Sequence, residues 1–388
     1  MAETSEVVIV GGGVAGCSVA YYLALAGVKS IIVEREGLAT QASGFSAGGL
    51  NPLEGAQIPG PLAPLALESY HMHLKLWDAL KEDTGIDYQG RIISLVKVAF
   101  QESEIPELQQ SRVIFAAAAS DGFSARWLDR QEVLELEPRL SPEIIQGLYA
   151  RGNAALDSYR YTLALARAAE KRGVAVRSAA VCGLKLATGR VTGVILADGE
   201  IDCDYLVLAA GPWSREAETW LDITIPVDPL KGEILRLEWP GPAPRHDISG
   251  GGGSLHPKPD GLIWCGTTEE WRGFDKDLSE SARQSILWGA VRLMPDLAHA
   301  RLARQTACLR PVTPDWLPIV GQAPGWDNVY LTTGAGKKGI LLSPGMGQAT
   351  ADLITRGSTS LSIGPAAPDR FARASRSTAP TGKDGDND

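Results

Sequence analysis

The sequence contains few of the residues that define several common classes of protein. Its 388 residues include five cysteines and five histidines; no two cysteines are spaced as CxxC and no two histidines as HxxxH. An odd, scattered set of cysteines is typical of free thiols in a reducing compartment. We therefore expect no disulfide framework, no dithiol flavoenzyme and no metal site.

Positive charge and long apolar runs are also scarce. Lys and Arg number 37 against 46 Asp and Glu, which gives a formal charge of −9 and argues against general nucleic-acid binding. No apolar run approaches the roughly 20 residues of a transmembrane helix. The first six residues carry acids and no Lys or Arg, unlike a secretory signal. We expect a cytoplasmic protein, and peripheral membrane association stays open.

Glycine, in contrast, is abundant and is placed informatively near the start of the chain. A β-branched run at Val7–Val10 leads directly into Gly11–Gly16, and a helical stretch is expected over residues 17–26. A second apolar run, Ser30–Val33, ends on Glu34. Strand, glycine turn, helix, strand and acid in this order are typical of a dinucleotide-binding unit. The alternative is a glycine-rich turn in some other α/β protein.

Each residue of this motif has a physical role. Gly11 allows the tight turn, Gly13 lets the backbone approach a diphosphate, and Gly16 lets the helix pack on the strands. The helix N-terminus offers N–H groups and partial positive charge to phosphates. Glu34 would accept hydrogen bonds from ribose hydroxyls and would repel a 2′-phosphate, so NADP is disfavoured.

The length predicts two joined domains. Periodicity predicts helices over residues 65–84, 129–136, 159–172, 279–294 and 340–354, and strands over 91–96, 174–176, 180–181, 191–196, 204–209 and 329–333. The glycine run in 249–254 predicts a turn or mobile loop. The polar end, residues 374–388, is expected to be disordered.

Three later segments combine with the N-terminal motif. They are Leu208–Ser214, Cys308–Gly321 with its Leu-Arg-Pro sequence, and Gly334–Pro344. Together with Gly11–Gly16 they make the chain, over about residues 6–357, resemble the D-amino-acid oxidase family of flavoproteins, which includes glycine and sarcosine oxidases and D-amino-acid dehydrogenases. The ordered set of motifs is specific for the family and much less so for the substrate.

The resemblance implies an α/β fold and FAD as the cofactor. A discontinuous Rossmann-type FAD-binding domain is expected from residues 1–85, 145–220 and 305–357. A substrate domain on a mixed or antiparallel sheet is expected from 86–144 and 221–304, followed by a partly disordered tail over 358–388. Binding of FAD is expected to be non-covalent, with a covalent link to Cys308 as the less favoured alternative, because a buried free cysteine often simply packs.

The resemblance also implies which residues bind the cofactor. They are Gly11, Gly13, Val14, Ala15, Gly16, Glu34, Arg35, Ala42, Ser43, Ala47, Gly48, Gly49, Val181, Gly211, Gly336, Lys338, Gly339, Ile340 and Leu341. Lys337 or Lys338, beside a helix N-terminus, would stabilise negative charge near N1 and the C2 oxygen of the reduced flavin. Read from the residues alone, two lysines flanked by glycines are an anion-facing arrangement or a solvated surface turn.

Arg310 is the residue that we expect to bind the substrate. The family places an arginine here over the flavin, where its planar guanidinium grips a carboxylate in a bidentate manner. The alternative is a structural salt bridge. Arg310 and Lys337 are thus the two expected catalytic residues. The implied reaction transfers hydride from Cα of a small amino or N-methyl amino acid to flavin N5; the imine is hydrolysed, and oxygen becomes hydrogen peroxide.

The chain departs from glycine oxidase-like sequences at three positions. Ala335 stands where a histidine is usual, Lys337 where an arginine is usual, and Ser254 where a substrate-contacting tyrosine is usual. These changes predict a larger, more polar or differently closed pocket and leave the substrate open. No His–Asp pair or Glu base is evident in the sequence, which agrees with hydride transfer.

Three other functions remain possible from the sequence. One is a dehydrogenase of the same family that passes electrons to a quinone or a partner protein. Another is a flavin-carrying subunit of a hetero-oligomer. A nicotinamide-dependent dehydrogenase is disfavoured by the segment at Gly334–Pro344. The oligomeric state, homo- or hetero-oligomer, is not fixed by the sequence.

Overall fold

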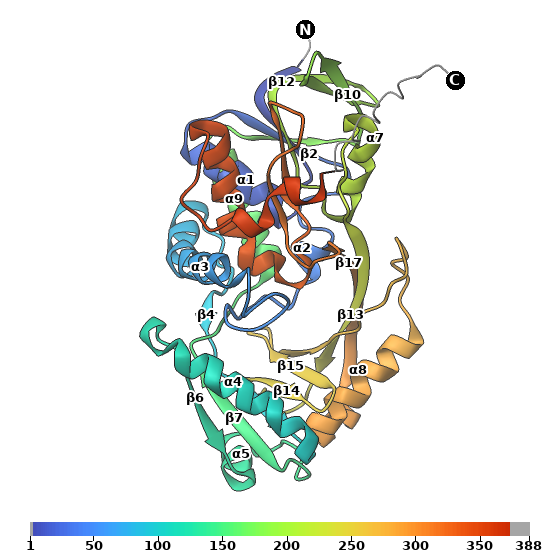
Figure 1. Cartoon of the computed structure of the whole chain (residues 1–388). Coiled ribbons are helices and arrows are strands. Elements are labelled where there is room, and N and C mark those ends of the chain that lie inside the picture. Colours follow the sequence, from blue (N-terminus) through green and yellow to red (C-terminus); the bar gives the residue numbers. More distant parts are fainter. Residues whose placement is uncertain (1–2, 373–388) are drawn as a thin grey trace, which may run out of the picture.

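Two eight-stranded sheets organise the computed structural model, which describes residues 3–372 (Figure 1). The predicted disorder of 374–388 lies outside this range. The first sheet contains β1 (Glu3–Val10), β2 (Ser30–Glu34), β9 (Ala175–Ser178), β10 (Val181–Ala187), β11 (Arg190–Leu196), β12 (Gly199–Leu208), β18 (Ile319–Gln322) and β19 (Val329–Thr333). The second contains β5 (Leu95–Ala99), β6 (Ser124–Leu128), β7 (Gln146–Arg151), β13 (Asp228–Glu238), β14 (Asp247–Gly250), β15 (Gly253–Pro257), β16 (Leu262–Gly266) and β17 (Arg301–Val312).

The remaining elements connect and cover these sheets. Three short strands, β3 (Gly49–Leu50), β8 (Ala154–Ala155) and β4 (Arg91–Ile92), form a third sheet. The α-helices are α1 (Val14–Leu25), α2 (Ala42–Phe45), α3 (Ala63–Thr84), α4 (Ile105–Ala117), α5 (Arg130–Leu136), α6 (Ser158–Glu170), α7 (Glu218–Leu221), α8 (Glu280–Leu293) and α9 (Gly339–Arg356). None of the helices within residues 3–372 is long and apolar enough to cross a bilayer.

The centre of the first sheet is parallel and fully buried. β1 lies between β12 and β2, with Val8 opposite Leu206 in one ladder and Ile31 in the other. On its other edge, the carboxyl-terminal end of β12 pairs with β19. Both faces are covered, and Val7, Val8 and Ile9 of the predicted β-branched run are completely buried, as expected for a central parallel strand; Val10, at its end, is partly exposed. The α/β fold and the strand–turn–helix–strand order predicted at the N-terminus are therefore confirmed.

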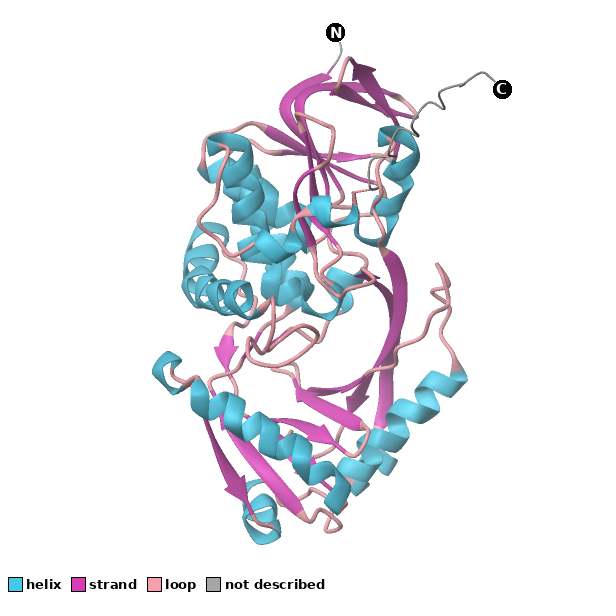
Figure 2. Cartoon of the chain, in the orientation of Figure 1, coloured by secondary structure: helices cyan, strands magenta, loops and turns pink. Residues whose placement is uncertain are grey.

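Helices α1, α3, α6 and α9 pack together beside this sheet (Figure 2). Glycines permit the close approach of α1. A Cβ on Gly16 would lie 2.0 Å from the carbonyl oxygen of Gly11, and a Cβ on Gly347 in α9 would lie 2.3 Å from Oγ of Ser18. Helix α9 continues through Pro344 and is buried over most of its length, so the predicted helix from 340 is confirmed.

The second sheet is mixed, and it includes two strands that the sequence analysis assigned to the cofactor domain. Strand β7 pairs with β5 and β6, and β17 pairs along its whole length with β13. Segments 146–151 and 305–312 therefore lie in the second sheet. The sequence alone did not show which sheet each of these segments would join. Strand 91–96 is also divided, into β4 and β5.

Candidate active site

One cavity is lined by residues of both sheets. One wall is formed by the carboxyl ends of β1, β2, β12 and β19, and the other by residues of β13, β15 and β17. In open α/β sheets, ligands bind outside the carboxyl ends of the strands. The predicted site residues that line this cavity are Gly11, Gly13, Val14, Ala15, Glu34, Arg35, Ala42, Ser43, Ala47, Val181, Gly211, Arg310, Gly336, Lys337, Gly339 and Ile340.

The glycine turn between β1 and α1 forms a cradle for a diphosphate. Gly11 has φ +110°, and a Cβ there would lie 2.6 Å from the carbonyl oxygen of Ala209, so only glycine fits. The backbone N–H of Val14, in the first turn of α1, donates to Oγ of Ser43 at 2.8 Å. The helix N-terminus therefore faces a polar part of the cavity, as a phosphate site requires.

Glu34 is held at the end of β2 by the same turn. Its carboxylate accepts hydrogen bonds from the backbone N–H of Gly12 at 2.6 Å and of Glu36 at 2.8 Å. It also accepts a bond from the backbone N–H of Gly37 at 3.4 Å. Three of the about four lone-pair sites of a carboxylate are then used, which leaves about one open to a ribose hydroxyl. Beside it, the guanidinium of Arg35 stacks over the Trp213 ring at 4.6 Å.

At the other end of the cavity, Arg310 on β17 lies across strand β13. A Cβ on Gly232 would lie 2.1 Å from Nη1 of Arg310, so the glycine makes room for the guanidinium. Nη2 donates to Oγ1 of Thr267 at 2.6 Å, and Nη1 donates to the carbonyl oxygen of Thr268 at 3.1 Å. A guanidinium has five N–H groups, so three stay available to a ligand.

The two lysines before α9 have different surroundings. Lys337 lines the cavity, and its ammonium lies 2.7 Å from the Glu269 carboxylate. Lys338 points elsewhere: its buried ammonium donates to the carbonyl oxygens of Asn51, at 2.9 Å, and of Glu54. Burial lowers the pKa of Lys338 to about 8. The structure thus places Lys338 as a tether for the loop after β3, away from the cavity wall.

Four other predicted cofactor residues do not line the cavity. Gly16 acts in packing α1 on the turn, as predicted from the motif. Gly48 has φ +74° and packs against the carbonyl of Leu156, Gly49 lies in β3, and Leu341 is buried in α9. These residues belong to the same segments as residues that line the cavity. The spacing along a motif does not distinguish a lining residue from its neighbour.

Cys308 lies on the cavity wall, where a link to a flavin was considered. Its thiol is buried, and burial raises its pKa while the positive charge of Arg310 opposes that shift. A buried, protonated thiol is a poor nucleophile, because thiolate is the reactive form. The surroundings of Cys308 therefore favour non-covalent binding of the cofactor.

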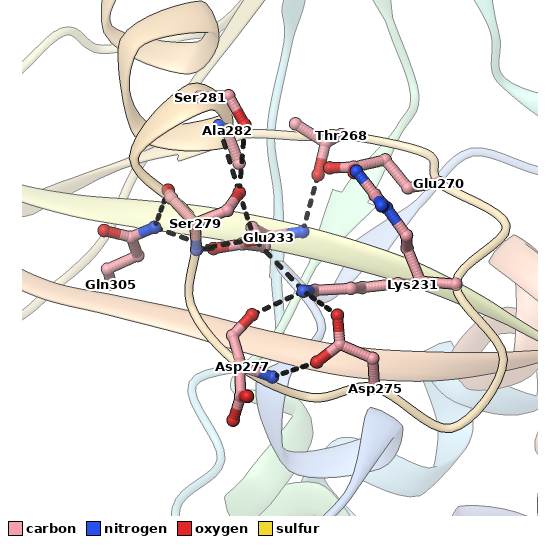
Figure 3. A network of polar contacts seen from close by, with 11 residues as sticks. Lys231, Glu233, Thr268, Glu270, Asp275, Asp277, Ser279, Ser281, Ala282 and Gln305 are labelled. Atoms are coloured by element: carbon pink, nitrogen blue, oxygen red, sulfur yellow. Dashed lines mark hydrogen bonds and ion pairs between the residues drawn. The ribbon is translucent and has the colours of Figure 1, made fainter.

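A buried polar network fixes the loop that contacts Arg310 and Lys337 (Figure 3). Lys231 lies 3.7 Å from Glu233 and 3.1 Å from Asp275, and the Glu233 carboxylate accepts bonds from Ser279 and Gln305 at 2.9 and 2.7 Å. Lys231 and Glu233 are almost completely buried. Both ends of the segment 267–279 are thereby anchored to strand β13.

The sequence analysis noted Ser254 as a pocket position but missed the two polar residues that accompany it, His256 and Asp247. Ser254 and His256, alternate residues of β15, both line it, and Asp247 of β14 lies behind His256. The His256 ring bridges the two other side chains, with Nε2 at 3.2 Å from Oγ of Ser254 and Nδ1 at 3.2 Å from the Asp247 carboxylate. A two-residue glycine turn followed by Ser-x-His was the available signal.

The cavity therefore has the features of a flavin dinucleotide site: a glycine cradle, a fixed carboxylate for ribose and a cationic end for a substrate. Comparison with known proteins agrees. Residues 6–353 match the family described as "DAO: FAD dependent oxidoreductase". The chain belongs to this family, and it is an FAD-dependent oxidoreductase.

Two similar sequences and one solved structure illustrate what the chain resembles. Glycine oxidase of Geobacillus kaustophilus (strain HTA426) is 30% identical over 369 residues, which cover 94% of this chain and 97% of that protein. The crystal structure of glycine oxidase from Geobacillus kaustophilus superposes with a TM-score of 0.88 at 28% identity, covering 95% of this chain and 99% of the other. A D-amino acid dehydrogenase of Xanthobacter autotrophicus (strain ATCC BAA-1158 / Py2) is 29% identical over 90% of this chain and 95% of its own.

Proposed function

We propose that the protein oxidises the C–N bond of a small amino or N-methyl amino acid and passes the electrons to oxygen. The observation that carries this proposal is the position of Arg310, which lines the same cavity as the glycine cradle and uses only two of its five N–H groups in bonds to Thr267 and Thr268. A guanidinium with fixed orientation binds a carboxylate in a bidentate manner and so sets the orientation of the adjacent Cα.

The cofactor-binding residues in this proposal are the predicted ones that line the cavity. Backbone N–H groups at the start of α1 would hold the diphosphate, and the Glu34 carboxylate would accept a ribose hydroxyl. Bound FAD supplies the hydride acceptor and the route of electrons to oxygen. Lys337, near the start of α9, would place positive charge beside the flavin, with Glu269 holding its ammonium.

The protein side chains then position the substrate and exclude competing reactions. Arg310 holds the carboxylate, and the wall formed by Ile234, Cys308 and Ala335 keeps water from the reacting Cα. Loss of hydride from Cα converts the amine to an imine, and water hydrolyses the imine to a carbonyl compound and the free amine or ammonia. The residues need only bind and orient, because the hydride acceptor is the cofactor.

The second candidate is a dehydrogenase that uses a quinone or a partner protein as the acceptor, possible because a D-amino acid dehydrogenase is also a relative. Oxygen consumption and peroxide formation by the purified holoenzyme distinguish the two, using glycine, sarcosine and D-alanine as substrates. One equivalent of peroxide per substrate oxidised supports the oxidase. Turnover that needs a soluble quinone analogue supports the dehydrogenase, and turnover only after lysate is added supports a subunit of a larger complex.

We also propose a cytoplasmic location, supported by five cysteines that all remain free thiols in the structure. Fractionation of cells that express the native protein tests this. Recovery in a secreted or periplasmic fraction would contradict it.

A further inference from the structure

The wall of the cavity that faces Arg310 contains a Ser–His–Asp chain that the reaction described above does not use. It begins at Ser254, whose Oγ lines the cavity, passes through His256 and ends at the Asp247 carboxylate. The side chains of His256 and Asp247 are 25% and 14% exposed. Partly buried polar groups on a cavity wall cost desolvation energy, so an apolar wall would be the simpler way to fill the same space.

The hairpin between β14 and β15 sets the register that builds this chain. Gly251 and Gly252 form its two-residue turn, with φ of +53° and +83°, as a type I′ turn requires. In the resulting ladder Ile248 lies opposite Leu255, so the next residues outward, Asp247 and His256, face one another across the two strands. Ser254 and His256 then share the cavity face, since alternate residues of a strand point the same way.

The chain lies close to Arg310. Oγ of Ser254 is 3.0 Å from the carbonyl oxygen of Gly266, and Arg310 donates to Thr267, the next residue. Gly266 pairs with Ser254 across strands β15 and β16, so the Ser254 hydroxyl and the guanidinium held by Thr267 both lie beside the same end of β16. A small amino acid whose carboxylate binds Arg310 therefore has Ser254 on the same wall. The wall thus offers the Arg310 guanidinium to the carboxylate of a bound amino acid. To the rest of that molecule it offers the Ser254 hydroxyl, which contacts His256 and, through its ring, Asp247.

The hydrogen bonds of the chain can be satisfied in two protonation states. With a neutral ring, Nδ1–H donates to Asp247, and Nε2 accepts the hydroxyl proton of Ser254. With an imidazolium ring, both nitrogens donate, and the Ser254 hydroxyl turns to donate to the carbonyl oxygen of Gly266 instead. Rotation of one hydroxyl therefore lets His256 gain a proton without leaving a buried polar group unpaired.

We propose that this chain takes the proton that the substrate ammonium must lose before oxidation. The proposal rests on the proposed function, since it concerns the same substrate. An ammonium has no lone pair to assist loss of hydride from Cα. In the step, one N–H bond of the ammonium breaks and its electron pair stays on nitrogen. The proton passes to Ser254 Oγ, and the hydroxyl proton of Ser254 passes to Nε2 of His256, which leaves an imidazolium paired with the Asp247 carboxylate.

Histidine suits this role because its ordinary titration falls between about pH 5 and 8. The charged groups around strand β15 are those of Arg91, Asp157, Arg236, Asp247, Lys258 and Asp260. Of these, the Asp247 carboxylate makes the direct contact with the ring, at 3.2 Å.

The first test is the rate of anaerobic flavin reduction as a function of pH, measured by stopped flow on the holoenzyme with an amine that reduces it. The variants are His256→Gln, Asp247→Asn and Ser254→Ala, with the exposed His299→Gln as the matched control. We expect the rate of flavin reduction in the wild type and in His299→Gln to fall in the same way as the pH is lowered. His256→Gln should lose that pH dependence and keep its flavin. The amine should reduce this flavin about 100-fold more slowly than that of the wild type near pH 7. Asp247→Asn should move the fall in rate to lower pH.

Superimposable profiles for the wild type and His256→Gln, at equal flavin content, would overturn the proton-acceptor role and leave the proposed function intact. Failure of every amine to reduce the wild type would overturn both. If His256→Gln does not fold, the Asp247→Asn and Ser254→Ala profiles decide in its place, and unchanged profiles for both overturn the proposal.

A second test needs no turnover. 2-Aminoisobutyrate has no Cα–H and so cannot be oxidised, and isobutyrate is its match without the amine. NMR of ¹⁵N-histidine-labelled holoenzyme near pH 7.5 should show protonation of Nε2 of His256 with the first compound and no change with the second. Identical ring signals with both compounds, each at saturation, would contradict the proposal.

Discussion

The guanidinium of Arg310 and the hydroxyl of Thr267 are joined by a hydrogen bond of 2.6 Å from Nη2 to Oγ1. This bond fixes the orientation of the guanidinium beside Gly232, and Arg310 lines the cavity. The arginine is therefore oriented before any ligand arrives, which reduces the entropy lost on binding. The loop that holds Thr267 is itself anchored by Lys231 and Glu233.

Replacement of Arg310 should separate substrate binding from cofactor binding. Arg310→Ala should keep its flavin and weaken the affinity for the carboxylate substrate about 10- to 100-fold, since one charge-assisted hydrogen bond contributes about 1.5–3 kcal/mol. Arg310→Lys should recover only part, because an ammonium lacks the planar fork. Anaerobic titration followed by flavin absorbance measures this. Arg301→Ala, exposed on the same strand, is the control, and unchanged affinity in Arg310→Ala would refute carboxylate recognition.

Replacement of Glu34 should weaken FAD binding and leave the fold intact. Glu34→Gln keeps a side-chain oxygen for the backbone N–H of Gly12 but offers a ribose hydroxyl a neutral acceptor. We expect the Kd for FAD to rise about tenfold, the equivalent of one charge-assisted bond weakened by about 1.4 kcal/mol. Reconstitution of the apoprotein followed by fluorescence measures it. The exposed Glu170→Gln should bind FAD normally, and equal affinities in both variants would exclude ribose recognition by Glu34.

The buried pair of Lys231 and Glu233 should show strongly non-additive effects on stability. Lys231→Met leaves the Glu233 carboxylate buried without its cation and should lower the free energy of unfolding by about 3–5 kcal/mol. The double variant with Glu233→Leu should recover part of that loss. Urea denaturation measures both, with Lys276→Met on the exposed part of the same loop as the control. A loss below about 1 kcal/mol in Lys231→Met, the size expected of a surface ion pair, would show that the pair is not effectively buried.

The pH dependence of stability should contain a contribution from Lys338. Burial lowers its pKa from 10.5 to about 8, so between these values the unfolded chain binds more protons than the folded one. Stability contributed by this group therefore rises as the pH rises from 8 to 10.5, by at most about 1.4 kcal/mol per pH unit. Below pH 8 the full cost of burying the charged ammonium is present.

Comparison with Lys338→Met isolates that contribution. The difference in free energy of unfolding between the wild type and Lys338→Met should move in favour of the wild type over this window. Lys75→Met, an exposed lysine of α3, is the matched control. A difference that stays flat from pH 8 to 10.5 would show that the ammonium of Lys338 reaches water.

Local patterns in the sequence predicted the cofactor half of the molecule well. The strand at Val7–Val10, the turn at Gly11 and the helix containing Pro344 follow from β-branched runs, obligatory glycines and apolar periodicity, and these signals are contained in single segments. Helix α4 was missed because only Leu108, Ser111 and Phe115 of its residues are buried, which leaves weak periodicity.

The substrate half depends on pairing between strands, which a sequence shows poorly. Residues 305–312 were expected in the FAD-binding domain as part of 305–357, and in the structure strand β17 pairs along its length with β13 of the second sheet. The contact between Asp247 and His256 depends on the register of one hairpin, and a shift by a single residue would move His256 to the opposite face. For that reason a His–Asp pair was judged absent from the sequence, whereas the structure contains one.

The central claim is that this cavity brings FAD and a carboxylate-bearing amine together, and the visible spectrum of the purified holoenzyme tests it most directly. The spectrum is recorded under anaerobic conditions before and after addition of glycine, sarcosine or D-alanine. We predict flavin absorption bands that bleach with at least one of these amines and not with the matching carboxylic acid that lacks the amine. A protein without flavin bands, or bands that no amine bleaches, would contradict the account.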